Sequence, residues 1–305
     1  MAQPAAVNVQ ADVAPASERQ IEYQKKGFIR TFIERNPVGA IGFAILLFYI
    51  LLAIFGPILV SADNPTDVQA IYAPPSAEHP LGTDFMGKDV LEQVIRGGRS
   101  IVVVGLLAAL LTTFIGVVLG SLSAMIGGRF DTSMLVLADV VLTVPGIILL
   151  SVLAAYVRVD SPFLLAFIIA ITAWPTLLRA VRAQVLSLKE REYVEAAKML
   201  DLGTSHILFR EIIPNMMSYI LINFVFAMTA AIYAQIFLYF LGLVPLSGDN
   251  WGLMIQQAYT KGALFFKDSL LYILAPIVMI SVLQLSLVMI SRSLEDVFNP
   301  RLREG

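Results

Sequence analysis

Residues 82–88 are the part of the chain whose spacing comes nearest to a catalytic motif. They follow the pattern G-x-x-x-x-G-K, in which backbone N–H groups surround a phosphate and the lysine, here Lys88, contacts it. Asp89 comes next, where such a loop has Ser or Thr, and its carboxylate would repel phosphate. No buried strand precedes the run, because His79 and Pro80 stand there. We therefore reject a nucleotide site and predict that this chain does not hydrolyse ATP.

Metal and thiol chemistry have little material in this sequence. The chain has no cysteine, which excludes disulfides and thiolate catalysis, and its two histidines, His79 and His206, are far apart. His79 is expected in a turn, and His206 is expected to contact a partner or solvent rather than a metal. An enzyme would need clustered His, Asp or Glu, or a nucleophile beside a base, and we find neither. The sequence predicts no enzyme, no metal site and no cofactor bound by this chain.

The composition is that of a membrane protein. Hydrophobic residues make up 58% of the 305 residues and charged residues only 14%, with a mean hydropathy of +0.79. A soluble domain carries about a quarter charged residues. The net charge of -2 gives no sign of nucleic-acid binding.

Six apolar stretches are long enough to cross a bilayer, which takes roughly 20 residues. They are residues 38–60, 100–126, 134–157, 162–178, 219–243 and 270–290. Residues 100–290 would form a core of five helices, joined to the first helix by an outer loop over 61–99. The start of the chain is polar, so we expect a retained anchor over 38–60 rather than a cleaved signal peptide. The predicted fold class is an all-α membrane protein with six transmembrane helices.

Lysine and arginine counts predict the orientation in the membrane. With the N-terminus inside, the cytoplasmic segments carry fifteen of the 21 basic residues and the outer segments carry six. Residues 1–37, 291–305 and a charged segment over 179–214 are therefore expected in the cytoplasm. Between Ile21 and Ile33, apolar residues recur near helical spacing among basic ones, which favours a helix lying in the membrane interface.

The charged segment, residues 179–214, is expected to form a protruding pair of helices. Small residues at Ala196 and Ala197 would let another surface approach one helix face closely. A turn over residues 201–203 would then send a second helix off at an angle, with Gly203 at positive φ. A bent helix pair outside the membrane indicates a docking knob rather than a catalytic site. The residues assigned to it are Glu195, Ala196, Ala197, Asp201, Leu202, Gly203 and His206.

Polar residues inside the predicted spans are candidates for a transport pathway. Asp139 is the one acidic residue in these spans, and an ionisable group there is a functional hypothesis by default. It could instead accept hydrogen bonds from a neighbouring helix. Gly116 and Gly120 form a G-x-x-x-G pattern, which favours close helix contact within the subunit or across a dimer. Four more candidates could face a polar cavity or join helices: Asn223, Thr229, Tyr233 and Gln235.

The loop before residue 90 contains turn and cap signals. Gly82 and Gly87 allow tight turns, and Thr83 or Asp84 is expected to cap a helix that begins near Asp89. This predicts a rigid scaffold at the entrance to the second span, or simply a capped helix start.

Several segments, taken in order, resemble one protein family. The charged segment over residues 179–214, with Glu195-Ala196-Ala197 at its core, is similar to the EAA loop of ABC importer permeases. Residues 79–84, His-Pro-Leu-Gly-Thr-Asp, resemble the approach to the second span in permeases of the oligopeptide, dipeptide and nickel type. Other matching segments fall in the expected order: residues 127–131, 139–140, 145–146, 240–243, 250–252 and 296–301. The chain is identified as a member of this family, as the second, C-type subunit of a permease pair.

The resemblance implies the fold, the partners and the location. The fold would be that of a type I ABC importer permease with cytoplasmic coupling helices, in the cell inner membrane. A second, nonidentical permease subunit would complete a pathway for oligopeptides, or for related small solutes such as oligosaccharides or nickel chelates. Two ATPase subunits or domains, holding ATP and Mg, would bind the knobs, and an extracytoplasmic binding protein would deliver the substrate. Membrane lipid would cover the remaining surface.

The sequence departs from this family at three positions. Asp201 stands where the family usually has Gly, Leu137 where a basic residue is usual, and Gln235 where Glu is frequent. The alternative function is an ion-coupled secondary transporter. Such a protein needs a coupling site near the bilayer centre, often between paired halves, and we find only Asp139 and no inverted repeat.

Overall fold

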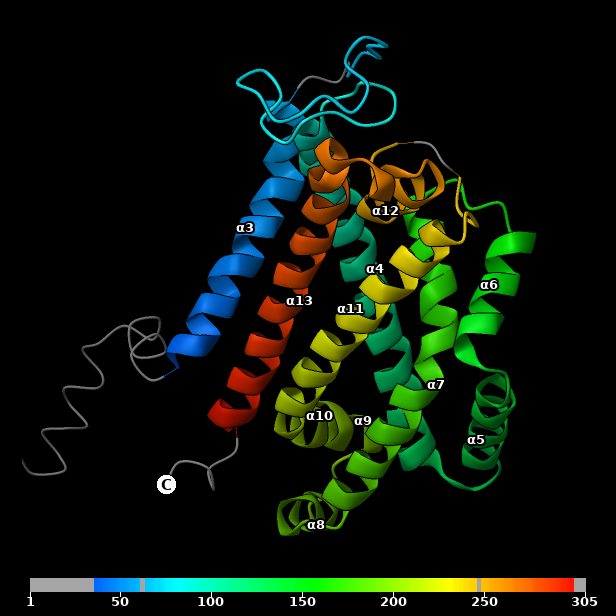
Figure 1. The fold of residues 1–305 in the computed structure, drawn as a ribbon. Helices are drawn as coiled ribbons and strands as arrows, with labels where there is room; N and C mark the ends of the chain where they lie inside the picture. Colours follow the sequence, from blue (N-terminus) through cyan, green and yellow to red (C-terminus); the bar gives the residue numbers. More distant parts are fainter. Residues whose placement is uncertain (1–35, 61–63, 246–247, 299–305) are drawn as a thin grey trace, which may run out of the picture.

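A computed structural model describes residues 36–60, 64–245 and 248–298. The regular secondary-structure elements assigned within these ranges are all helices. Five helices there are long and apolar enough to cross a membrane, and they run side by side as one bundle (Figure 1). They are α3 (Pro37–Leu59), α4 (Val90–Ile126), α7 (Pro162–Lys189), α11 (Met217–Phe240) and α13 (Leu270–Phe298). Five of the six predicted spans are confirmed at these places.

The remaining predicted span, residues 134–157, is not one helix. It is divided into α5 (Gly128–Thr143) and α6 (Gly146–Tyr156), which meet at an angle of 84°. Pro145 explains the break, because proline has no N–H to donate and its ring clashes with the carbonyl of the preceding turn. Val144 before it is extended, as a residue preceding proline prefers. The third predicted span is therefore broken rather than one continuous helix, and with the bent pair taken as one span the described residues hold six.

Several helices also continue past the predicted spans. α4 begins at Val90, as expected for a helix starting near Asp89, and so extends ten residues ahead of the predicted span. Its 37 residues correspond to about 55 Å of helix, against a hydrocarbon thickness of about 30 Å. α7 continues to Lys189 and α13 to Phe298, which places part of the expected tail in a helix. The interfacial helix predicted between Ile21 and Ile33 lies outside the described residues.

Short helices gather at opposite ends of the bundle (Figure 1). At one end, called the α8 end, lie α8 (Glu192–Met199), α9 (Thr204–His206), the π-helical turn η1 (Ile207–Ile212) and α10 (Ile213–Asn215). Residues 192–212 of this group are called the knob. At the other, α12 end, lie α12 (Trp251–Thr260), the 3₁₀ turns η2 (Ala263–Phe265) and η3 (Lys267–Ser269), and the loop over residues 64–89.

Close packing of α4 on α7 forms the centre of the bundle. A Cβ added to Gly116 would lie 2.7 Å from Leu177 Cγ, and one added to Gly120 would lie 2.6 Å from the Leu178 carbonyl oxygen. Both distances are shorter than side-chain contacts allow, so only glycine fits there. The G-x-x-x-G pattern thus lies at a helix contact within the subunit.

Trp251 fixes the α12 end onto α4. Its indole is fully buried, and its Nε1 donates a 2.8 Å hydrogen bond to the Val94 carbonyl. Gly97 and Gly98 make room for the ring, because a Cβ at either position would come within 2.9 Å of it. Tyr49 of α3 packs edge-on against the same ring, with centroids 5.9 Å apart. One aromatic side chain therefore joins α3, α4 and α12.

Candidate docking knob and transport cleft

The knob is held to the bundle by a small apolar face of α8. Val194 and Ala197 are buried and share an apolar cluster with Val185 near the end of α7. Glu195 and Ala196 are exposed. Residues three apart share a helix face, so Ala197 points inward with Val194 while its two predecessors point outward. The expectation that both alanines face another surface is therefore corrected: only Ala196 is free to do so.

The turn after α8 contains Asp201 at the position where the family usually has glycine. Asp201 has φ 54, in the left-handed region, which Asp tolerates better than most residues. The Leu202 N–H donates to the Ala197 carbonyl at 3.1 Å, which closes the end of the helix. Gly203 has φ -59 and ψ 155, and a Cβ there would meet no atom within 4 Å. The prediction of a positive φ at Gly203 was wrong, since the turn is completed two residues earlier.

The knob presents three large apolar side chains that sequence reasoning missed. Met199 is 86% exposed, Leu200 73% and Phe209 65%. They flank the turn, and His206 between them is half-buried. The missed signal was their position: Met199 and Leu200 at the end of α8 fall off the helix face that carries Val194 and Ala197, and Phe209 lies on η1. An exposed apolar group on a polar protrusion is typical of an interaction site.

A cleft of 890 Å³ opens between α4, α6, α7 and α11. Most of its lining is apolar, and Asn223 and Tyr233 are the two predicted pathway residues that reach it. Three threonines on the other helices also line it and were not predicted: Thr112, Thr172 and Thr176. Thr172 and Thr176 are one turn apart on α7, which was the available signal. The cleft therefore collects scattered hydroxyl and amide groups in an apolar wall, as ligand-binding clefts do.

The other three predicted pathway residues lie elsewhere. Gln235 is fully buried, and its Nε2 donates to the Ser100 carbonyl and hydroxyl, both at 3.3 Å. Thr229 is not among the residues that line the cleft, and its backbone carbonyl accepts from Gln284 of α13 at 3.4 Å. Asp139 forms an ion pair with Arg179 of α7. The side chains of Gln235 and Asp139 thus join helices, which was the alternative left open for them.

In the structure, residues 82–88 do not form a phosphate-binding loop. The backbone N–H groups of Met86 and Lys88 donate to Asp84 Oδ1 at 2.7 and 2.9 Å, and Gln93 Nε2 donates to Asp84 Oδ2 at 2.8 Å. Asp84 is 2% exposed. Its carboxylate thus occupies the donors that a nucleotide loop would direct at phosphate. Gly82 and Gly87 both have φ 74, which agrees with the predicted tight turns.

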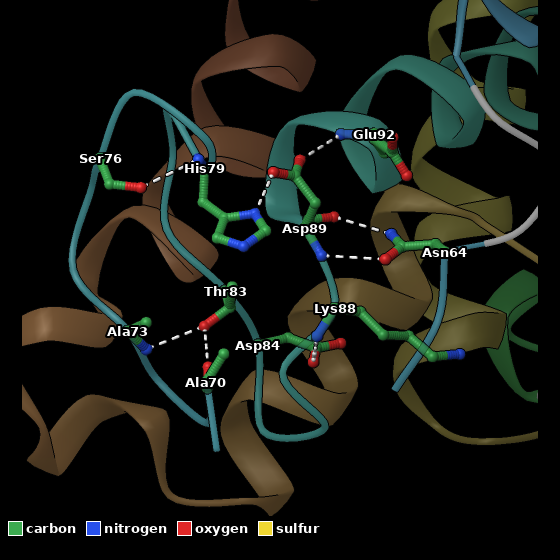
Figure 2. A network of polar contacts seen from close by, with 10 residues as sticks. All are labelled: Asn64, Ala70, Ala73, Ser76, His79, Thr83, Asp84, Lys88, Asp89 and Glu92. Atoms are coloured by element: carbon green, nitrogen blue, oxygen red, sulfur yellow. Dashed lines mark hydrogen bonds and ion pairs between the residues drawn. The ribbon is translucent and has the colours of Figure 1, made fainter. Parts of the chain in front are cut away.

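Asp89, and neither Thr83 nor Asp84, caps α4 (Figure 2). Its Oδ1 accepts from the Glu92 N–H at 2.9 Å, while its Oδ2 contacts His79 Nδ1 at 2.9 Å. The Asn64 side chain bonds to both the N–H and the carbonyl of Asp89, at 3.0 Å each. The predicted caps are used elsewhere, because the Thr83 hydroxyl accepts from the Ala73 N–H at 2.8 Å. The loop at the α12 end is therefore a closed hydrogen-bonded unit.

An ion pair closes the other side of this unit. Arg96 Nε lies 2.8 Å from Asp249 Oδ2, so α4 is bound to the residues just before α12. Burial raises the pKa of the Asp249 carboxyl, while the positive charges of Arg96 and Lys88 lower it. Within the described ranges, no group of three or more His, Asp or Glu residues is placed to hold a metal ion.

Five membrane-length helices, a broken sixth and a knob at one end define a multi-pass membrane protein of the transporter class. Residues 116–304 match the family described as the inner membrane component of binding-protein-dependent transport systems. Residues 28–75 match the N-terminal transmembrane domain of oligopeptide transport permease C. The chain belongs to the family of binding-protein-dependent transport inner membrane components, with the type I ABC permease fold.

Relatives support the same assignment over the whole length. The chain is 33% identical to the oligopeptide transport system permease protein OppC of Bacillus subtilis, over 100% of this chain and 98% of that protein. It is 32% identical to the dipeptide transport system permease protein DppC of the same organism, over 89% and 84%. A putative peptide transport system permease of Brucella suis is 32% identical over 86% and 88%. The chain is thus a permease subunit, and the ion-coupled alternative is not favoured.

Proposed function

We propose that this chain is one half of the translocation pathway of a peptide importer, in which it pairs with a second, nonidentical permease subunit. The peptide class is carried over from the oligopeptide and dipeptide permeases to which the chain is similar over nearly its full length. The 890 Å³ cleft has the size and apolar character to border a path for short peptides, whose backbone could bond to Asn223 and the threonines. The pathway would be completed by the partner subunit.

The knob is the observation that carries the coupling part of the proposal. Its apolar side chains Met199, Leu200 and Phe209 are exposed, although it is anchored from beneath by buried Val194 and Ala197. A rigidly seated protrusion with an apolar tip suits insertion into a groove of an ATPase subunit that binds ATP and Mg. Closure of two such ATPases would bring two knobs together and reverse the side on which the cleft opens. An extracytoplasmic binding protein would supply the peptide.

We propose that both termini and the knob are cytoplasmic, because most basic residues lie in the segments on that side. The chain has no natural cysteine, so single cysteines report position without background. Glu190, beside the knob, and Pro75, in the loop at the α12 end, are both exposed. Membrane-impermeant maleimide should label them from opposite faces of sealed vesicles. Labelling of both from one face would contradict this topology.

Reconstitution of the chain with its co-purifying partner subunits tests the function. The complex in proteoliposomes should accumulate short peptides when ATP and the binding protein are supplied, whereas the isolated chain should show no vanadate-sensitive ATP turnover. Lys88→Ala should leave ATP turnover by the complex unchanged, because this lysine belongs to the α12-end loop. Uptake of peptides by the isolated chain, driven by an ion gradient without ATP, would overturn the assignment.

A further inference from the structure

α5 is held to the bundle by a narrow apolar contact and by charge. Of its sixteen residues only Ala138 is buried, and that residue packs with Trp174 and Leu178 of α7. Three partly buried residues of α5 pack around this contact: Met134, Leu135 and Val141. The helix ends at the 84° elbow before α6, so the backbone beyond it does not fix its direction.

Two ion pairs also attach α5 to α7. Asp131 in the first turn of α5 accepts from Arg182 in a bidentate pair, with Nε–Oδ1 and Nη2–Oδ2 distances of 2.5 Å. Asp139, two turns further along α5, pairs with Arg179. The two arginines are three residues apart and therefore lie on one side of α7. Attachment at two points along a helix fixes both its position and its direction.

The Asp131 pair also includes the helix before α5. Ser123 of α4 is fully buried, and its hydroxyl donates to Asp131 Oδ1 at 2.5 Å. Asp131 thus connects α4, α5 and α7 at the α8 end. The Asp131 carboxylate accepts from the Ser123 hydroxyl and from two N–H groups of Arg182. Loss of the arginine would leave its charge only partly compensated and would therefore cost stability.

The arginines belong to the part of α7 that supports the knob. Val181 and Val185, on either side of Arg182, lie in the same apolar cluster as Val194 and Ala197 of α8. The knob and this end of α7 are therefore packed together. Because α5 is bonded to the same end of α7 through Arg179 and Arg182, a displacement of the knob would be passed to α5.

α5 in turn ends beside the transport cleft. Gly146 and Ile147, the first residues after the elbow, line the cleft. α6 itself is packed in a different apolar cluster, through Leu150 and Ala154. A change in the direction of α5 would therefore be concentrated at Pro145, directly at the cleft wall.

We propose that the Asp131–Arg182 and Asp139–Arg179 pairs are positioning residues for transport, which transmit movement of the knob to the elbow at the cleft. The inference rests on the proposed function, because it assumes that the knob is driven by an ATPase. The pairs act through α5, and none of their four residues is among those that line the cleft.

Uptake per ATP hydrolysed, measured in the reconstituted complex, is the first test. Arg179→Gln with Arg182→Gln should keep ATP hydrolysis but lower peptide uptake per ATP by about 10-fold, within the usual range of coupling between sites. The charge-reversed pair Asp131→Arg with Arg182→Asp should recover at least part of the loss that Arg182→Asp causes alone. Arg129→Gln, which removes an exposed charge from the same turn of α5, is the matched control and should behave as wild type. An unchanged ratio in the double glutamine variant, or no recovery by the reversed pair, would refute the proposal.

A second measurement does not depend on transport. Spin labels on cysteines at Val136 of α5 and Ala183 of α7, both exposed, should give one narrow distance distribution in the wild-type complex, with or without ATP and vanadate. The double glutamine variant should give a broad distance distribution. A narrow distribution in that variant would refute the proposal that the two ion pairs position α5. If the glutamine variant does not assemble, Arg182→Lys, which keeps the charge but loses the bidentate geometry, decides by the same two readouts. Absence of ATP-driven uptake by the wild-type complex would instead count against the proposed function alone.

Discussion

The two ends of the helix bundle are stabilised in opposite ways. At the α12 end, buried polar groups such as Asp84 and Asn250, each 2% exposed, are hydrogen-bonded to the loop and to the adjoining helices, and Trp251 is fully enclosed. At the α8 end, the knob is seated by buried apolar residues such as Val194 and Ile212 and leaves Met199 and Phe209 exposed. Both ends expose apolar side chains, including Phe265 at the α12 end, and they differ in that buried, hydrogen-bonded polar groups hold the α12-end loop whereas apolar packing holds the knob.

This difference separates a scaffold from a contact surface. Polar groups that are removed from water must find partners inside the protein, and a loop that supplies all of them has one conformation. Exposed apolar side chains gain free energy only when a second surface covers them. Substitutions at the α12 end should therefore affect folding, and substitutions at the tip of the knob should affect association.

The largest effect is expected at a glycine of the α12-end loop. A Cβ at Gly87 would overlap the backbone of Asp67, and the residue has φ 74. Gly87→Val should therefore destabilise the protein by about 3 kcal/mol or more, measured by thermal unfolding in detergent. Gly203→Val in the knob is the matched control, because Gly203 has φ -59 and open space around it, and its unfolding should shift little. Equal shifts for both variants would remove the contrast between the two ends.

The next effect concerns the carboxylate that organises the same loop. Asp84→Asn loses one acceptor for its three donors and should cost about 1.5 kcal/mol of unfolding free energy. Asp67→Asn makes the same chemical change at an exposed position, where Oδ1 accepts from the Gln69 N–H. This variant should leave the unfolding free energy nearly unchanged. A stability loss at Asp67 as large as that at Asp84 would show that loop burial does not decide the effect.

At the α8 end we expect loss of association without loss of stability. Phe209→Asp places a charge on an exposed apolar contact and should weaken binding of the ATPase subunit by about 10-fold, with the unfolding temperature unchanged. Ala197→Trp should act differently, because Ala197 is 5% exposed and a large ring would displace the packing beneath the knob. Co-purification and unfolding, measured on both variants, distinguish the two effects.

The smallest effect is expected at Glu195, which is exposed on α8. If its carboxylate meets a basic residue on the ATPase, Glu195→Gln should weaken association by less than about 1 kcal/mol, and less at high salt. Glu192→Gln on the same helix is the control for a general charge effect. Wild-type coupling in both Glu195→Gln and Glu195→Ala would exclude an electrostatic role for Glu195, although the apolar contact could stand.

Residues whose role depends on one helix were predicted better than residues whose role depends on two. Local properties such as length, φ and charge were enough to predict the apolar runs, the turns at Gly82 and Gly87 and the place of the knob in the sequence. Thr229 and Gln235 were grouped with Asn223 because all three are polar and share α11. The structure separates them, because a helix turns by about 100° per residue and its neighbours decide which side faces the cleft.

The sequence by itself determined that this protein crosses the membrane several times, that it carries a protruding charged segment and that Asp89 stands where a nucleotide loop has Ser or Thr. These features depend on the hydrophobic effect and on local backbone preferences, which act within one segment. Only the tertiary structure decided that Asp139 and Asp131 pair with arginines of α7, that Ala197 faces inward and that Pro145 turns one span into an elbow. Each of these depends on which surfaces meet across tens of residues, and the energy of an ion pair or a buried methyl is set by that meeting.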